Sequence, residues 1–137
     1  MRPQARFLTV AFSTALAAAC SSQAGVQNAP LHAGVGRTFE SDYNKTLGAA
    51  REAAVEAGLQ IESATQVDPD TYIIMCKAGT SAFSWGEIVR LVVVKENDTS
   101  TTVRVYSKRK SAVNIAAKGD YSNTILSNIE LKLKTST

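Results

Sequence analysis

The sequence predicts an α+β fold: a four-stranded antiparallel sheet with two helices on one face, in the order α-β-β-β-β-α. An alanine-rich helical pattern covers residues 43–57, four strand-like runs follow it, and a second helical pattern begins near residue 121. The loops between the strand-like runs are short, which favours antiparallel neighbours. Two helices on either side of such a meander can cover one face of the sheet, which gives a two-layer fold.

The first helix has a cap at each end. Ser41 or Asp42 can accept hydrogen bonds from the first turn, and Gly58 supplies the left-handed residue at which helices commonly end. The mostly small residues of its apolar face predict a close approach to a sheet. They follow spacings of three and four residues: Tyr43, Leu47, Ala50, Ala54 and Ala57.

Four predicted strands cover residues 59–65, 71–77, 85–95 and 101–108. Asp68-Pro69-Asp70 and the polar residues 96–100 form turns between them. The third strand is the most apolar and is expected near the centre of the sheet.

The face of the sheet away from the helices is a candidate binding surface. If Val89, Leu91 and Val93 point inward, alternation turns their neighbours on the strand outward. The outward set is apolar at its centre and carries cations, which is typical of a surface that meets a partner. Alternatively, Trp85, the loop after Ala78 or self-association covers it. The candidate partner face consists of Ile88, Arg90, Val92, Arg104 and Tyr106.

The last helix is predicted to begin after Gly119, with Asp120 or Ser122 as its cap. Lys132 and Lys134 stand near its carboxyl end, where cations suit the helix dipole. Its apolar face recurs every four residues and consists of Tyr121, Ile125, Ile129 and Leu133.

Composition bounds the function. The 137 residues are 45% apolar and 20% charged, as expected for one globular domain. The net charge of +3 includes Arg2 and Arg6, and their removal with a leader would leave about +1. The basic Lys108-Arg109-Lys110 cluster is interpreted as a solvated loop rather than a lipid or glycan contact. Nucleic acid is therefore not an expected partner.

The residues of hydrolytic and metal chemistry do not gather in the sequence. His32 is the single histidine, so a Ser-His-Asp or Cys-His site is not available. Cys76 lies within a predicted strand, and the Asp68-Pro69-Asp70 turn explains its two carboxylates. We therefore expect no enzyme activity, no catalytic residue, no cofactor and no metal site.

The amino terminus carries an export pattern. Arg2 and Arg6 precede an uncharged run, residues 7–19, which ends in small residues before Cys20. This arrangement resembles the lipobox of bacterial lipoproteins, in which the cysteine thiol receives a diacylglycerol and the new amino terminus is usually acylated too. The resemblance implies lipid attachment at Cys20. One departure is Ala17, at a position where that family prefers a branched apolar residue.

Two other readings of this segment stay open. Ala17-Ala18-Ala19 also fits an ordinary signal-peptidase site, which would release a soluble protein and permit a Cys20–Cys76 disulfide. An uncleaved anchor is disfavoured, because the apolar run is shorter than the roughly 20 residues that a spanning helix needs. The expected organisation is a signal peptide at 1–19, a flexible tether rich in small residues at 20–37, and a single α+β domain at 38–137.

The domain itself resembles the small, mostly uncharacterised lipoprotein domains of bacterial envelopes. The shared features are Phe39 before the first helix, Gly58 after it, the Thr101-Thr102-Val103 strand and Gly119-Asp120 at the last helix. More distantly, it is similar to the helix-grip domains of the lipoprotein subunit of the outer-membrane barrel assembly machine. The family has no established catalytic residues to carry over to this chain.

These resemblances imply a lipid-anchored envelope protein with a non-catalytic structural or assembly role and an envelope protein as partner. Ser21 favours the outer membrane, facing the periplasm, since inner-membrane retention in many Gram-negative lipoprotein families is associated with Asp at that position. The alternative is a soluble periplasmic module that binds a small apolar or anionic ligand, on the open face or between helix and sheet.

Overall fold

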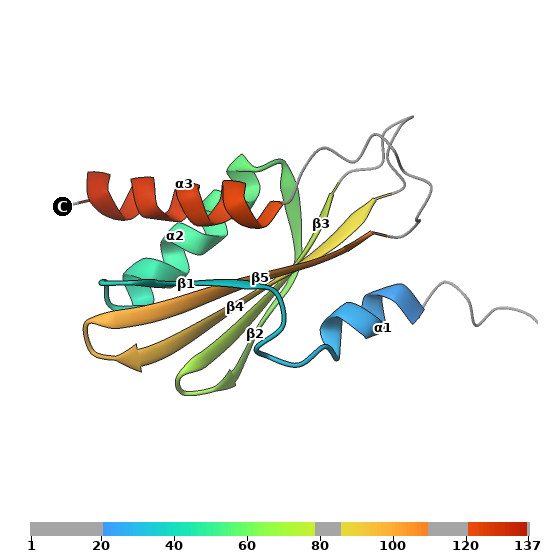
Figure 1. Ribbon diagram of the computed structural model, residues 1–137, viewed down its shortest axis with the longest axis horizontal. Coiled ribbons are helices and arrows are strands. Elements are labelled where there is room, and N and C mark those ends of the chain that lie inside the picture. Colours follow the sequence, from blue (N-terminus) through green and yellow to red (C-terminus); the bar gives the residue numbers. More distant parts are fainter. Residues whose placement is uncertain (1–20, 79–85, 110–120, 137) are drawn as a thin grey trace, which may run out of the picture.

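The computed structural model describes residues 21–78, 86–109 and 121–136. They form an α+β fold with one antiparallel sheet (Figure 1), which confirms the predicted class. The predicted strand number is wrong, because the sheet has five strands in the order β1-β5-β4-β3-β2. The strands are β1 (Val35–Phe39), β2 (Leu59–Asp68), β3 (Thr71–Ala78), β4 (Glu87–Asn97) and β5 (Ser100–Arg109), and the helices are α1 (Ser21–Gln27), α2 (Tyr43–Glu56) and α3 (Tyr121–Thr135).

The additional strand and helix come from the segment that was expected to be a flexible tether, residues 20–37. Strand β1 pairs antiparallel with β5, from Val35 opposite Val105 to Phe39 opposite Thr101. Gly34 has a φ of 93°, and a Cβ there would collide with the backbone of Val105. The glycine that suggested a tether therefore permits the close approach that starts β1.

Helices α2 and α3 pack against each other and over the same face of the sheet (Figure 1). Asp42 caps α2 by accepting a 2.9 Å hydrogen bond from the Lys45 amide, and Gly58 ends it with a φ of 84°. Small side chains let α2 approach the strands, as predicted. The core on this face includes Ala50, Ala53, Ala54, Ile74, Cys76, Val89, Leu91, Val93, Val103, Val105, Ile125 and Ile129.

Helix α1 lies on the opposite face of the sheet, against β4 and β5. Its buried Val26 joins Met75 and Ile88 in a second, smaller cluster, against which Ile73 and Tyr106 pack. The sheet is therefore covered on both faces, by a helix pair on one and by a short segment on the other.

The sheet has two ends that matter below. The hairpin end holds the β2–β3 and β4–β5 turns, and the α1 end is where β3 stops at Ala78, β4 starts at Glu87 and β5 stops at Arg109. Several expectations fall outside the described residues. They concern the leader, Cys20, Trp85, Lys110 and the Gly119-Asp120 helix start.

Candidate functional site

The candidate partner face points away from α2 and α3, as the alternation of β4 predicts. It is not open, however. Ile88, Arg90 and Val92 are only 4%, 0% and 1% exposed, so the expectation of an uncovered surface is wrong for these residues. The chain's own segment from α1 to Pro30 lies over the face. Trp85 and the loop after Ala78, which the sequence also offers as covers, lie outside the described residues.

Arg90 holds this covering segment through hydrogen bonds to its backbone. Nη1 donates to the carbonyls of Gln27 at 3.3 Å and Ala29 at 2.5 Å, and Nη2 donates to Pro30 at 2.8 Å. These carbonyls lie at and just beyond the carboxyl end of α1, where the helix dipole is negative. A buried cation with three carbonyl acceptors thus replaces the ion pair that a buried arginine commonly forms.

Two further features define the surroundings of Arg90. Its guanidinium lies over the Tyr106 ring at 5.6 Å from the centroid, which is within cation–π range. Burial lowers the pKa of Arg90 from its ordinary value, and Tyr106 acts in the opposite direction. An arginine keeps its charge at neutral pH, so the clamp stays cationic.

The other cations of this face stay nearer to solvent. Arg104 donates to the backbone carbonyl of His32 at 3.3 Å, and Lys108 reaches the side of α1 next to Gly25. Arg104 and Tyr106 are half-buried, whereas Lys108 is exposed. Arg104 and Lys108 therefore lie at the rim of the closed face, and its interior combines apolar side chains with buried Arg90.

Strand β2 forms one edge of the sheet, and its residues after Leu59 are exposed. Register shifts at Glu62 and Val67 interrupt its pairing with β3. Bulges of this kind limit pairing with other chains at a free edge. The stretch between them, residues 63–66, is uncharged and presents free backbone groups.

An apolar hollow of about 340 Å³ lies between α2 and this edge. Val55, which is 58% exposed, lines the hollow together with exposed Ile61. The two carboxylates that line the hollow, Glu52 and Glu56, are already paired. Lys132 bridges Glu52 and Glu56 at 3.1 and 2.6 Å, and Arg51 donates to the Tyr72 hydroxyl at 2.6 Å.

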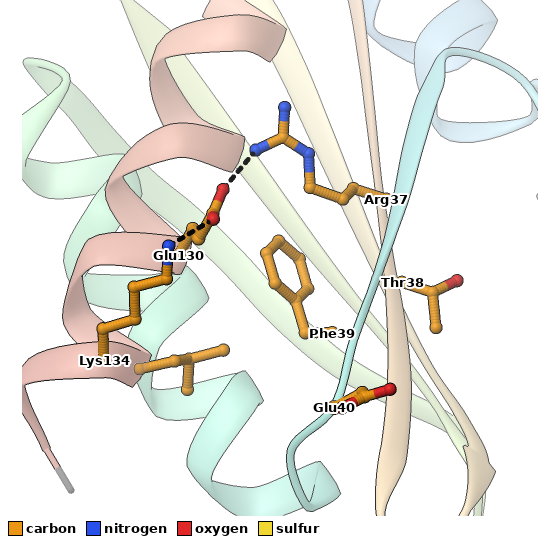
Figure 2. Close-up of a pocket in the computed structure, with 7 residues that line it drawn as sticks. Arg37, Thr38, Phe39, Glu40, Glu130 and Lys134 are labelled. Carbon is orange, nitrogen blue, oxygen red and sulfur yellow. Dashed lines mark hydrogen bonds and ion pairs between the residues drawn. The ribbon is translucent and has the colours of Figure 1, made fainter.

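A second hollow, of about 460 Å³, lies between β1 and α3 (Figure 2). Figure 2 shows Arg37 and Lys134 converging on Glu130 beside the Phe39 ring, with N–O distances of 3.1 and 2.7 Å. The hydrogen bond and charge of Lys134, with a smaller contribution from Arg37, lower the pKa of Glu130. The Glu130 carboxylate pairs with both cations, so salt bridges line this hollow at the border of the core.

A third hollow, of about 480 Å³, occupies the hairpin end. The amino end of α2 meets both hairpin turns there, and the lining includes Asp42, Asp70 and Asp98. Lys95 pairs with Asp98 at 2.9 Å. Within the described residues, no group of three or more His, Cys, Asp or Glu side chains could hold a metal ion.

Cys76 is a buried free thiol on the α2/α3 face. Burial, with a smaller contribution from Glu62, raises its pKa to about 11, so the thiol is protonated at neutral pH. Cys20 lies outside the described residues, so the Cys20–Cys76 disulfide that one reading of the sequence allows stays a prediction.

Sequence reasoning missed the covering segment. One clue was available, because Arg90 interrupts the apolar Ile88–Val94 run and a charge at that position requires acceptors. A second clue was Val26, an apolar residue in a polar stretch. The acceptors themselves are backbone carbonyls, which leave no mark in the sequence.

Comparisons and helix lengths complete the description. The chain matches no protein-family model, and a search of curated proteins found no significant relative. Of the helices in the described ranges, none has both the length and the apolar character needed to cross a bilayer.

Proposed function

We propose that this protein is a lipid-anchored component of the bacterial cell envelope with a non-catalytic structural or assembly role. The observation that carries the proposal is the export pattern of residues 1–19 ending at Cys20, followed directly by α1 at Ser21. Cys20 would receive the lipid, and Ser21 favours placement in the outer membrane, facing the periplasm. The raised pKa of buried Cys76 is consistent with a packing role for that thiol.

Intact mass of the mature protein from its native host tests the anchor. We expect a chain that begins at Cys20 and carries a diacylglycerol and an acyl chain, and we expect a Cys20→Ala variant to lack this lipid mass. An unmodified chain that begins at Cys20 would instead indicate a soluble exported protein and would refute the lipid anchor.

For the assembly role, the edge strand β2 is the proposed contact. An uncharged extended segment of an envelope protein would add alongside residues 63–66, with an apolar side chain in the hollow at Val55 and Ile61. The paired charges around that hollow favour an uncharged segment over an acidic or basic one.

Photo-crosslinking from position 64 in intact cells tests this contact. Val55→Asp should abolish a discrete crosslinked product, because it places a charge in the hollow. Leu131→Asp is the matched control, since Leu131 is 62% exposed on α3 and Val55 is 58% exposed on α2. If the two variants reduce the product equally, β2 is not the assembly surface.

The alternative function, binding of a small ligand on the open face, receives less support. The face of the sheet opposite α2 and α3 is covered by Val26 and the residues up to Pro30. The opposite face is filled by the packed core beneath α2 and α3.

A further inference from the structure

We propose that the α1 end of the sheet lies against the membrane and that the acidic hairpin end points away from it. The proposal rests on the proposed lipid at Cys20 and goes beyond it, because a lipid alone does not orient a domain. It follows from the attachment of α1, from its position on the sheet and from the distribution of charge.

First, no flexible linker separates the lipid site from the folded domain. Val26 is buried in the cluster with Met75 and Ile88, and Arg90 binds the carbonyls of residues 27, 29 and 30. Helix α1 starts at Ser21, so Cys20 is one Cα–Cα step of about 3.8 Å away from it. The position of α1 therefore determines where the lipid leaves the domain.

Second, the first residues of α1 lie at one end of the sheet. Gly25 lies beside Lys108 near the end of β5, and Gln23 donates to Glu62 at 3.4 Å. Figure 1 shows the start of α1 directed away from the two hairpin turns. A lipid on Cys20 would consequently bring the α1 end, rather than the hairpin end, to the bilayer.

Third, charge differs between the two ends. The α1 end has two lysines, Lys108 and Lys77, and two glutamates, Glu62, which pairs with Lys77 at 3.2 Å, and buried Glu87. The hairpin end has Lys45 and Lys95 but is dominated by exposed carboxylates. These are Glu40, Asp42, Asp68, Asp70, Glu96 and Asp98. Anionic headgroups therefore repel the hairpin end more strongly than the α1 end, where exposed Lys108 can contact them.

Fluorescence quenching in vesicles tests the orientation. Lipidated protein would be reconstituted in phosphatidylethanolamine and phosphatidylglycerol that contain a headgroup quencher. A dye would be attached through Gln60→Cys at the α1 end or Thr99→Cys at the hairpin end. Both positions are exposed and uncharged, buried Cys76 would not label, and neither position lies on α1. We expect several-fold stronger quenching from position 60.

Release of α1 provides the matched comparison. Val26→Asp puts a carboxylate into the small cluster and Arg90→Gln removes the clamp, so either should bring quenching at position 60 down toward the level at position 99. Val26→Asp leaves the sheet residues unchanged, which covers the case in which Arg90→Gln fails to fold. If quenching at position 60 persists in folded proteins with α1 released, the docked helix does not orient the domain.

Charge is tested separately. Lys108→Glu should weaken quenching at position 60, whereas Lys95→Glu at the hairpin end should not. Equal effects of the two substitutions would show that charge does not contribute to the orientation. Equal quenching at positions 60 and 99 in protein whose mass shows the lipid would refute the orientation and leave the anchor standing. Absence of the lipid would refute the anchor itself.

Discussion

The two faces of the sheet are closed in different ways. Beneath α2 and α3 the closure is apolar, with Leu91, Ile125 and Ile129 among its fully buried residues. Beneath α1 it depends on Val26 and on the polar clamp from Arg90 to three carbonyls. The first face requires global unfolding to open, whereas the second can open by release of one short segment. The face beneath α1 should therefore be less stable and more accessible to solvent and reagents than the face beneath α2 and α3.

The largest difference should come from two aliphatic truncations on β4. Leu91→Ala, beneath the helix pair, should cost about 3–4 kcal/mol in the free energy of unfolding. Ile88→Ala, beneath α1, should cost about 2 kcal/mol or less, because the thin cover can settle into the space or detach. Urea unfolding of both variants measures the difference. Equal losses would mean that both faces unfold as one unit.

Next in size is the effect of the clamp. Arg90→Gln should weaken the closure of α1 by about 2–3 kcal/mol, because it removes charged hydrogen bonds to three carbonyls, and exchange should accelerate by roughly a hundredfold. The amides of Asn28 and Ala29 report this opening in hydrogen exchange, since both bond within the segment. Arg104→Gln, which loses one 3.3 Å contact to His32, is the control and should change little.

Thiol labelling compares the faces at adjacent positions of β3. Cys76 has a pKa of about 11 against an ordinary 9.0, so at pH 8 it holds about a hundredfold less thiolate than a free cysteine and should react very slowly. A Met75→Cys thiol beneath α1, measured in a Cys76→Ala background, should react faster through local opening. Slower labelling at position 75 than at 76 would contradict the comparison.

The raised pKa of Cys76 also predicts that the protein loses stability at alkaline pH. The folded-state pKa of Cys76 lies above the unfolded value, so its contribution is fully present below pH 9 and is lost as the pH rises from 9 toward 11. Cys76→Ala should remove this part of the alkaline loss. Thermal melts across that interval measure it.

The smallest expected effect concerns the rim of the helix face. The folded-state pKa of Glu130 is lowered, mainly by Lys134, so its stabilisation is present above its unfolded pKa and is lost as the pH falls through the folded value. Glu130→Gln should flatten the acid limb of the stability curve slightly, since both ion pairs are partly exposed. An unchanged acid limb would show that the pairs in Figure 2 do not contribute to folding.

Much of the fold could be predicted because its determinants are side chains. The Asp42 cap, Gly58 and the alternation along β4 carry direct marks in the sequence, and all three are found in the structure. Strand β1 was missed because the small residues of 20–37 predict a tether, although one of them, Gly34, serves a close backbone approach to Val105. For α1, a helix of seven residues has little intrinsic stability and exists here through its tertiary contacts.

The candidate site divides in the same manner. The side on which Ile88, Arg90, Val92, Arg104 and Tyr106 face was predictable, because it follows from a period of two. Its coverage was not, because the acceptors of the two Arg90 Nη atoms are backbone carbonyls of residues 27, 29 and 30. Lipid attachment at Cys20 stays a prediction from the sequence.

The docking of α1 limits how far the domain can move from its anchor. About sixteen residues of free chain would let a domain wander over roughly 20–24 Å from its anchor, which sets a broad search volume and a low effective concentration toward any one neighbour. With α1 held by Arg90, the residues between Cys20 and β1 contribute almost none of that range. If the anchor is confirmed, the domain would remain in a thin layer at the bilayer surface. It would meet neighbours in the same membrane at a high effective concentration, and structures farther from the surface would be beyond its reach.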